Sequence, residues 1–513
     1  MSRQWNEGYF TDFNYTYGYY RELNPLFQRF CMLLKGVWSE PLSTEAAHCE
    51  LGFGQGLSFN IHAATNPGKF YGNDFNPSQA LHAQTLSTQA NLNTSIYDCS
   101  FAQFLTQELP DFDSISLHGI WSWVSSENRQ YLLEIVRKKL KVGGQLYVSY
   151  NSMPGWAAAA PLRQLFKIHN QYINHTADSL AGISQALDFS EKVLNLNPKY
   201  LLEAPFMKQR LERLRKQDPS YIAHEYFNDE WTCMYFADVA QLLESSKVEF
   251  IGTADPGDCL EALNLSADAL QYIATIPNPI AQEQLKDYFV SRQFRKDIYA
   301  KGKRLLSLAE RTEALRKTRF ALMVEPKAIP EKLVMPLGEI GLKQEIYRPI
   351  IDFLASNHFA PKTIDEITIA LPNLPLGQCL DAFIVLAHFS YVAPCHPKDL
   401  VPSLRAKSDT LNKAILERAQ FNGNISYLAS PVIGGGIAVN RFEQLFMVAL
   451  RQGMKKESEL AQYVFDIIAK QGQRVLKDGK PIESTEDNLA ILSTNAKEFL
   501  SGKLEILKAL QVY

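Results

Sequence analysis

Three glycines spaced by two residues, Gly52, Gly54 and Gly56, stand in the segment CELGFGQGLSF. Glycine has no Cβ, so a turn built from it can pass close to a ligand, and turns of this kind commonly wrap a nucleotide cofactor. A dinucleotide-binding fingerprint places its third glycine three residues after the second. Here the third follows after two, and an acid, Glu50, precedes the first. The alternative is that the glycines only tighten a turn.

Two further carboxylates follow the next two predicted strands. Asp74 ends a strand in GNDFNP, and Asp98 ends another in YDCS, directly before Cys99. The carboxyl ends of parallel strands meet at one edge of a sheet, where ligands of α/β proteins bind. The pattern therefore predicts carboxylates beside the glycine turn, although Asp74 could instead cap the helix that follows it.

The elements that would position these residues alternate between strand and helix over the first 150 residues. This alternation predicts an α/β fold with a doubly wound, parallel, Rossmann-like sheet. The predicted strands are 47–53, 69–75, 94–101, 112–120 and 144–151, and the predicted helices include 56–65, 78–90 and 127–144.

Beyond the fifth strand the pattern becomes helical and charged, which predicts a helical insertion at about 157–220. The alternation resumes with a helix at 235–247 and a strand at 249–256, and 292–300 is expected to add a late edge strand. We therefore expect a first domain over 1–320. Residues 321–513, called the C-terminal region below, are predicted to form a separable, mainly helical α+β unit with a winged-helix-like part at about 344–397.

The segment ELGFGQG resembles the ExGxGxG signature of class I S-adenosylmethionine-dependent methyltransferases. The resemblance extends to GYFTDFNYTYGYYRELNP, LHGIWSWVSSENR, YVSYNSMPGW, HEYFND, DYFVSRQFRKDI and LASPVIGGGIAVNR, which run from Gly8 to Arg441. Together these segments are similar to a bacterial family of methyltransferases that carry a methyltransferase regulatory domain. That family includes rickettsial protein-lysine methyltransferases.

The resemblance implies S-adenosyl-L-methionine as the cofactor and gives the acids their roles. Asp74 would hold the ribose hydroxyls, and Asp98 would accept from the adenine amino group. His118, which ends the fourth strand, would lie beside them, although a structural histidine is an equal alternative. The predicted cofactor-binding residues are Glu50, Gly52, Gly54, Gly56, Asp74, Asp98, Cys99 and His118.

Aromatic residues follow the fourth and fifth predicted strands and mark the return from the insertion. Aromatic faces attract sulfonium and ammonium cations, and an apolar wall lowers the pKa of a lysine that must lose its proton before it attacks. The predicted catalytic residues are Trp121, Trp123, Tyr150, Trp156 and Glu225. The alternatives are that the aromatics belong to the core and that Glu225 only pins the insertion. Five tyrosines near the N-terminus could likewise belong to the site or to the core. They are Tyr9, Tyr15, Tyr17, Tyr19 and Tyr20.

The composition limits the other classes of function. The formal net charge of -3 gives no overall basic surface for nucleic acid. The seven cysteines form no CxxC pair, and no metal-ligand spacing is visible. The sequence shows no secretory signal and no apolar run long enough for a membrane span, so a cytoplasmic protein is expected.

The sequence therefore predicts an enzyme that methylates lysine side chains of a protein substrate. Methylation of a small molecule or a cell-surface glycan precursor is the second hypothesis. A nucleic-acid methyltransferase ranks third, because HGIWSWV contains no NPPY-type or DPPY-type motif. A cofactor-sensing interaction protein is the alternative that involves no catalysis. The sequence does not determine the oligomeric state, and a homodimer is one possibility.

Overall fold

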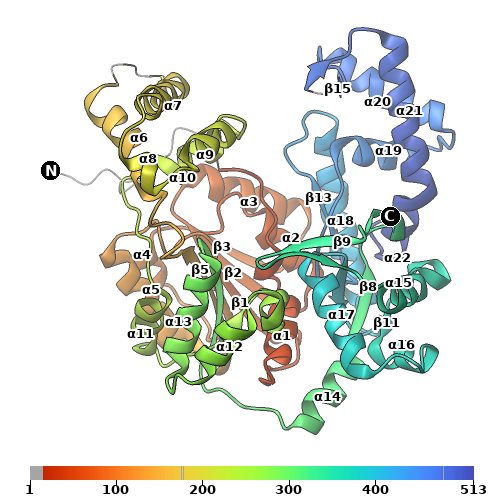
Figure 1. Ribbon diagram of the computed structural model, residues 1–513. Helices are drawn as coiled ribbons and strands as arrows, with labels where there is room; N and C mark the ends of the chain where they lie inside the picture. Colours follow the sequence, from red (N-terminus) through yellow and green to blue (C-terminus); the bar gives the residue numbers. More distant parts are fainter. Residues whose placement is uncertain (1–14, 175, 177, 478) are drawn as a thin grey trace.

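The structure is a computed structural model that describes residues 15–174, 176, 178–477 and 479–513. Tyr9 lies outside the described residues. Among the described residues, no helix has the length and apolar character needed to span a membrane. The chain forms a twisted sheet flanked by helices and a mainly helical C-terminal region that packs against it (Figure 1).

A seven-stranded sheet in the order β3-β2-β1-β4-β5-β7-β6 forms the centre of the first domain. The first five strands are parallel, and β7 is antiparallel to both of its neighbours. The predicted Rossmann-like fold is confirmed, although the sheet is mixed. The strands are β1 (Ala47–Leu51), β2 (Lys69–Asp74), β3 (Thr94–Asp98), β4 (Phe112–Leu117), β5 (Leu140–Asn151), β6 (Glu249–Thr253) and β7 (Phe294–Ala300).

The prediction of an edge strand at 292–300 was wrong, because β7 lies inside the sheet between β5 and β6. Arg295 and Asp297 of this strand are fully buried. Arg295 is paired with Asp297 at 3.0 Å, Asp287 at 2.7 Å and Glu283 at 2.8 Å. Buried charges are tolerated when they are paired in this way.

Helices connect the parallel strands, and polar caps fix where several of them begin. Asn76 caps α3 through the Ser78 amide, and Ser125 caps α5 through the Asn128 amide. The predicted helix 127–144 ends early, because Leu140 adopts an extended backbone and begins β5. These helices are α1 (Pro25–Leu34), α2 (Leu57–Thr65), α3 (Pro77–Gln89), α4 (Phe101–Leu105) and α5 (Ser126–Lys139).

The helical insertion lies above the sheet at the upper left of Figure 1 and has its own apolar core, which includes Trp156, Phe166 and Leu211. The insertion contains α6 (Ala160–Tyr172), α7 (Ser179–Asn195), α8 (Tyr200–Glu203), α9 (Met207–Leu214) and α10 (Pro219–Tyr226). The chain then returns to the sheet through α11 (Phe236–Glu244), α12 (Ala267–Ala274) and α13 (Pro279–Val290).

The C-terminal region begins after α14 (Leu308–Lys317) with three helices and a three-stranded antiparallel sheet, an arrangement like that of a winged helix. They are β8 (Arg319–Leu322), α15 (Gln344–Phe359), β11 (Lys362–Thr363), α16 (Ile364–Ala370), α17 (Leu376–His388) and β12 (Val392–Cys395), with β9 (Lys332–Met335) and β10 (Gly338–Gly341) as a hairpin. The rest contains α18 (Val401–Ala419), β13 (Tyr427–Ser430), β14 (Gly435–Ala438), α19 (Arg441–Arg451), α20 (Glu457–Lys470), β15 (Leu476–Lys477), β16 (Lys480–Pro481), α21 (Thr485–Glu498) and α22 (Leu504–Ala509).

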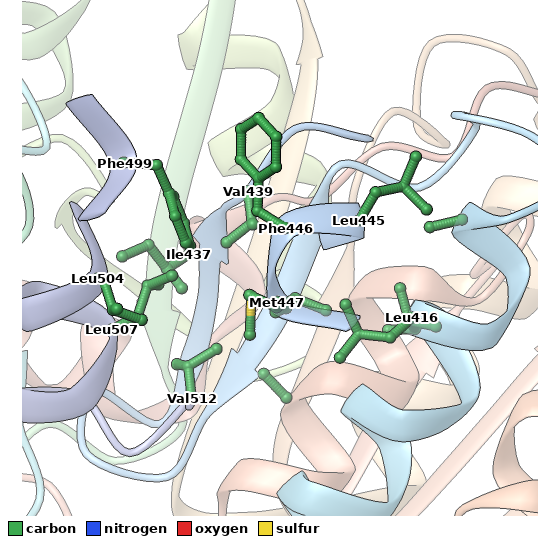
Figure 2. Packing of buried hydrophobic residues seen from close by; sticks show 14 of the residues in the cluster. Leu416, Ile437, Val439, Leu445, Phe446, Met447, Phe499, Leu504, Leu507 and Val512 are labelled. Atoms are coloured by element: carbon green, nitrogen blue, oxygen red, sulfur yellow. The ribbon is translucent and has the colours of Figure 1, made fainter. Parts of the chain in front are cut away.

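The C-terminal region, predicted to be separable, shares an apolar core with the first domain. Its apolar cluster, part of which is drawn in Figure 2, continues into Leu57 and Ile61 of α2 and Leu86 of α3. Hydrogen bonds cross the same boundary, from the Asn66 side chain to the Gly434 carbonyl at 2.7 Å and between His396 Nε2 and the Thr65 carbonyl at 3.0 Å. The two parts therefore share buried surface that truncation would expose.

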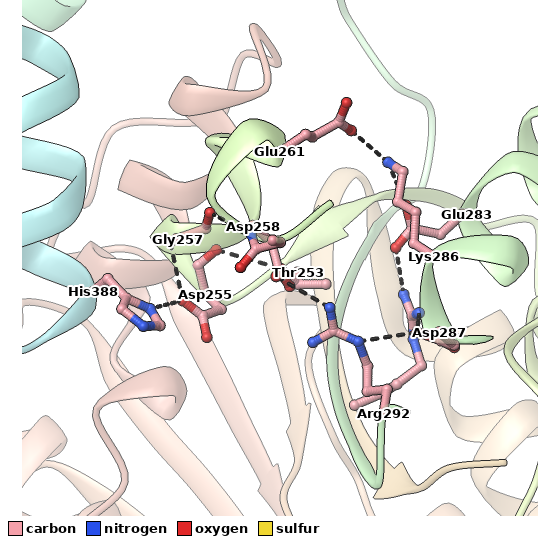
Figure 3. A network of polar contacts seen from close by, with 12 residues as sticks. Thr253, Asp255, Gly257, Asp258, Glu261, Glu283, Lys286, Asp287, Arg292 and His388 are labelled. Atoms are coloured by element: carbon pink, nitrogen blue, oxygen red, sulfur yellow. Dashed lines mark hydrogen bonds and ion pairs between the residues drawn. The ribbon is translucent and has the colours of Figure 1, made fainter. Parts of the chain in front are cut away.

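A second contact between the two parts is polar (Figure 3). His388 of α17 lies 2.5 Å from the carboxylate of Asp255, which follows β6. Asp258, three residues on, pairs with Arg292 at 3.1 Å, and Arg292 pairs with Asp287 at 2.9 Å. This network joins the C-terminal region to the loop that leads into β7.

The shared core predicts that a cavity made on one side destabilises the whole chain. Replacing the buried Leu416 of α18 by alanine should lower the free energy of unfolding by about 2–5 kcal/mol. Calorimetry should show one transition at a reduced temperature. Leu308→Ala, at a leucine that is 79% exposed, is the matched control and should change the free energy by about 0.5 kcal/mol or less. Two separate transitions, only one of them shifted, would contradict the shared core.

Candidate functional site

A cavity of about 830 Å³ opens at the carboxyl ends of β1, β2, β3 and β4, below the insertion. Its walls contain every predicted cofactor-binding residue and three of the five predicted catalytic residues. These are Glu50, Gly52, Gly54, Gly56, Asp74, Asp98, Cys99 and His118 for the cofactor, and Trp123, Trp156 and Glu225 for catalysis. The structure therefore brings together residues that lie far apart in the sequence.

The glycine turn needs its glycines for backbone reasons. Gly52, Gly54 and Gly56 have φ angles of 69°, 59° and 68°, in the left-handed region that residues with a side chain rarely adopt. The Gly54 amide donates to Asp74 Oδ2 at 2.8 Å, which joins the turn to the end of β2. A Cβ at Gly56 would overlap Ala83 of α3, whereas a Cβ at Gly54 would lie 3.7 Å from Tyr15, its nearest neighbour among the described residues. A methyl group would therefore fit beside Gly54 in ordinary van der Waals contact.

Burial raises the pKa of both acids next to this turn. The pKa of Glu50 rises to about 8, through burial first and the charge of Asp74 second. The pKa of Asp74 rises to about 7 through burial, although the amides of Asn76 and Gly54 hold it lower than burial alone would. Both groups therefore titrate close to neutral pH, where a cationic ligand would favour their ionised forms.

The environments of Cys99 and His118 suit residues that line the cavity better than residues that react. Burial raises the pKa of the Cys99 thiol to about 11, so it is protonated at pH 7. Burial lowers the pKa of His118 to about 4, so its ring is neutral. His118 Nδ1 lies 2.8 Å from the Tyr147 hydroxyl, and its ring stacks on Tyr20 with centroids 4.0 Å apart.

An aromatic wall closes the cavity on the side of the insertion. Trp156 lies edge-on to Trp231, with ring centroids 5.2 Å apart, and Trp123 lies 6.5 Å from the same ring. The Arg210 guanidinium from α9 lies over Trp156 at 4.6 Å. This wall holds the helical insertion against the end of the sheet.

Trp121 and Tyr150 do not reach the cavity, which corrects their predicted place beside the acceptor. Trp121 is buried in the apolar cluster between the sheet and its helices. The Tyr150 hydroxyl is buried and donates to Asp297 at 2.7 Å. Successive side chains of a strand point to opposite faces, so residues that share a strand end need not share a site. Asn151, the next residue, does line the cavity.

Glu225 lies on α10 and lines the cavity together with His224 and Tyr226. Burial raises the pKa of Glu225 to about 7, and the charges of Arg163 and Arg210 limit this rise. Its carboxylate is therefore poised to gain or lose a proton near neutral pH.

The N-terminal tyrosines divide between the cavity and the C-terminal region. Tyr15 and Tyr20 line the cavity. Tyr17 lies edge-on to His82 at 4.9 Å, and Tyr19 lies 5.0 Å from Tyr427 of β13. Gly435 and Gly436 approach Tyr19 so closely that a Cβ at either position would touch its ring or hydroxyl.

Other lining residues gave no signal that sequence reasoning used. Arg210 enters the wall from α9, and Gln293 and Phe294 enter because β7 lies inside the sheet. Four amide side chains of the wall each leave one buried polar atom without a hydrogen-bond partner among the described residues. These atoms are Gln55 Nε2, Asn73 Oδ1, Gln79 Nε2 and Asn151 Nδ2. Buried polar groups are normally paired, so these atoms indicate a polar ligand.

Comparison with known proteins gives the family. The model of a predicted methyltransferase regulatory domain matches residues 218–301. An uncharacterized protein of Synechocystis is 38% identical over 512 residues, which cover 99% of each chain. The chain belongs to the bacterial methyltransferases that carry this regulatory domain. An uncharacterized protein of Rickettsia prowazekii is 23% identical over 57% of this chain and 51% of its own.

This methyltransferase also has a solved structural relative. PKMT2 from Rickettsia typhi, in complex with AdoHcy, matches with a TM-score of 0.69 and 19% identity, over 98% of this chain and 100% of its own. The match confirms the fold from the sheet through the C-terminal region. The matched regulatory domain begins within the insertion at α10, which carries Glu225, and ends after β7.

The glycine turn predicts a difference between two substitutions that place the same side chain in the same backbone region. Gly54→Ala should lower the free energy of unfolding by about 1–2 kcal/mol, the cost of a left-handed residue with a Cβ. Gly56→Ala should lower it further, because the new methyl group also meets Ala83. Chemical denaturation of both variants measures the difference. Equal losses would contradict the close packing of α3 on Gly56.

Proposed function

We propose that this methyltransferase binds S-adenosyl-L-methionine at the glycine turn and methylates a lysine side chain of a protein. The observation that carries the cofactor assignment is the Gly54–Asp74 pair at the cavity edge, with unpartnered amide groups around it. The resemblance to class I methyltransferases and the presence of AdoHcy in PKMT2 from Rickettsia typhi support it.

The residues present fit this cofactor. The cavity supplies carboxylates for hydroxyl and amino groups, in Asp74 and Asp98, and a second buried acid, Glu50, for a cationic group. Gly54 lines the cavity and has no Cβ, which lets the backbone approach a ligand. When bound, S-adenosylmethionine supplies a methyl group activated by a sulfonium. No group of three or more potential metal-ligating side chains was found among the described residues.

The titration of the two acids predicts how cofactor affinity depends on pH. Ribose hydroxyls that donate to Asp74 and an ammonium group beside Glu50, both present in S-adenosylhomocysteine, favour the ionised carboxylates, so their pKa values fall on binding and protons are released. Calorimetry with S-adenosylhomocysteine should therefore show affinity rising from pH 6 towards pH 8, and levelling above the pKa values of about 7 and 8. Asp74→Asn should weaken binding by about 1.5–3 kcal/mol.

Asp113→Asn is the matched control for this experiment. Asp113 lies at the opposite end of the sheet, where it accepts from the Ala47 amide at 2.7 Å and from Lys141 at 2.8 Å. It should leave cofactor affinity unchanged. If affinity is independent of pH and Asp74→Asn binds like the unaltered chain, the assignment of Asp74 is wrong.

The chemistry of the aromatic wall supports lysine as the methyl acceptor. The aromatic rings of Trp123 and Trp156 can surround an alkyl ammonium group and exclude water. Only neutral lysine attacks a methyl group, and an apolar wall disfavours its charge. Glu225, with its pKa raised to about 7, is placed on the same wall and can take the proton once it is ionised.

Labelling with tritiated S-adenosylmethionine in whole-cell lysate tests the acceptor. Protease should destroy the labelled product, nuclease should not, and mass spectrometry should find the methyl groups on lysine. Trp123→Ala should lower the labelling rate by about tenfold or more, with little change in cofactor affinity, because it removes part of the acceptor wall. Trp38→Ala is the control, since Trp38 packs on Arg304 outside the cavity wall.

Other outcomes of this experiment separate the remaining hypotheses. Label only on carboxylates, nucleobases or a small metabolite would overturn the lysine assignment and leave the methyltransferase assignment intact. Cofactor binding without any label would favour a sensor. The rate should rise with pH through the pKa of Glu225, and Glu225→Gln should lose that rise. An unchanged pH profile in this variant would remove Glu225 from the proposal.

A further inference from the structure

The outer side of the glycine turn contacts a histidine that does not line the cavity. His82, on α3, lies with Nδ1 2.7 Å from the backbone carbonyl of Gln55, the residue between Gly54 and Gly56. Gln55 is buried, and its side chain lines the cavity. The ring of His82 therefore contacts the turn without lining the cavity.

The other ring nitrogen of His82 is held by the C-terminal region. Arg418 of α18 lies with Nη1 2.8 Å from His82 Nε2, and its Nη2 donates to the side chain of Gln89 at 3.1 Å. A guanidinium group can only donate, so Nε2 must accept. The hydrogen of the neutral ring is then on Nδ1, where it is donated to the Gln55 carbonyl. The Gln55 carbonyl and Arg418 thus require the same tautomer, and the ring of His82 bridges Arg418 and the turn.

Packing around Arg418 and His82 keeps the arginine in place. Helix α18 packs against α2 and α3, and Ser408 of α18 donates to the Ala64 carbonyl at 3.1 Å. Ile415 and Leu416, on the same helix, belong to the shared core. The ring of Tyr17 lies edge-on to His82. The guanidinium is therefore presented by a helix fixed to the first domain on several sides.

Other hydrogen bonds hold the two ends of the turn, from the Gly52 amide to the Asn73 carbonyl at 2.8 Å and from the Gly56 amide to the Phe53 carbonyl at 3.0 Å. Glycine adopts many backbone conformations at low cost, and Gln55 is flanked by two glycines. The Gly54 amide is held by Asp74 on one side of the Gln55 residue, and the Gln55 carbonyl is held by His82 on the other. These two contacts together fix the peptide groups that face the cavity.

We propose that Arg418 is a positioning residue for the cofactor-binding turn and acts through His82 on the carbonyl of Gln55. The C-terminal region then contributes to cofactor affinity without touching the cofactor. The inference rests on the proposed function, because cofactor affinity is the property that Arg418 would change.

The test measures S-adenosylhomocysteine affinity of the full-length chain by calorimetry. Arg418→Leu should weaken binding about three- to tenfold, the effect of losing one hydrogen bond that orders the turn. Arg418→Lys, which keeps a donor, should restore most of the affinity. Arg405→Leu is the matched control, because Arg405 is an exposed arginine of the same helix that pairs only with Asp409 among the described residues. It should bind like the unaltered chain.

A second measurement reports the contact between Arg418 and the His82 ring and not merely the fold. Nitrogen NMR of histidine-labelled protein should show a neutral His82 ring with its hydrogen on Nδ1 in the unaltered chain and in Arg418→Lys. In Arg418→Leu the pKa of His82 should rise, because burial then lowers it without the help of the guanidinium charge. Unchanged affinity in Arg418→Leu, or an unchanged His82 pKa, would overturn this inference. Failure of the unaltered chain to bind S-adenosylhomocysteine would instead overturn the proposed function.

Discussion

The hydrogen bond from the Gly54 amide to the Asp74 carboxylate is the contact on which the site depends. It joins the turn after β1 to the end of β2, and it can form only because glycines accept the left-handed backbone of the turn. The cavity, its buried acids and the contact with His82 all lie around this loop. One short segment thus forms the boundary between the sheet, the ligand cavity and the C-terminal region.

Much of the fold and of the cofactor wall could be predicted, because those features depend on local sequence. Strand ends such as Asp74 and Asp98 follow apolar runs, and the order of parallel strands brings such ends to one edge. The position of β7 could not be predicted in this way. Its Arg295 and Asp297 are charged, and their burial depends on the ion pair between them and on the packing of α13, which brings Glu283 and Asp287 to Arg295.

The acceptor wall was predicted less well, because it depends on which face of an element a side chain occupies. Trp121 and Trp123 are two residues apart, yet the first is in the core and the second lines the cavity. Tyr150 and Asn151 differ in the same manner. Arg210 is brought over Trp156 by tertiary packing of the insertion, which no local pattern in the sequence indicated.

The N-terminal segment has a consequence for the order in which the protein matures. Tyr15 and Tyr20 complete the cavity, while Tyr19 fits against Tyr427 and the glycines at 435 and 436. During synthesis the tyrosines leave the ribosome before their partners near residue 430, which lie roughly 400 residues further along the chain. Domains tend to fold as they emerge, but this wall of the cavity cannot be completed until the segment near residue 430 has been made. A nascent chain that ends before that segment would therefore hold an unfinished site.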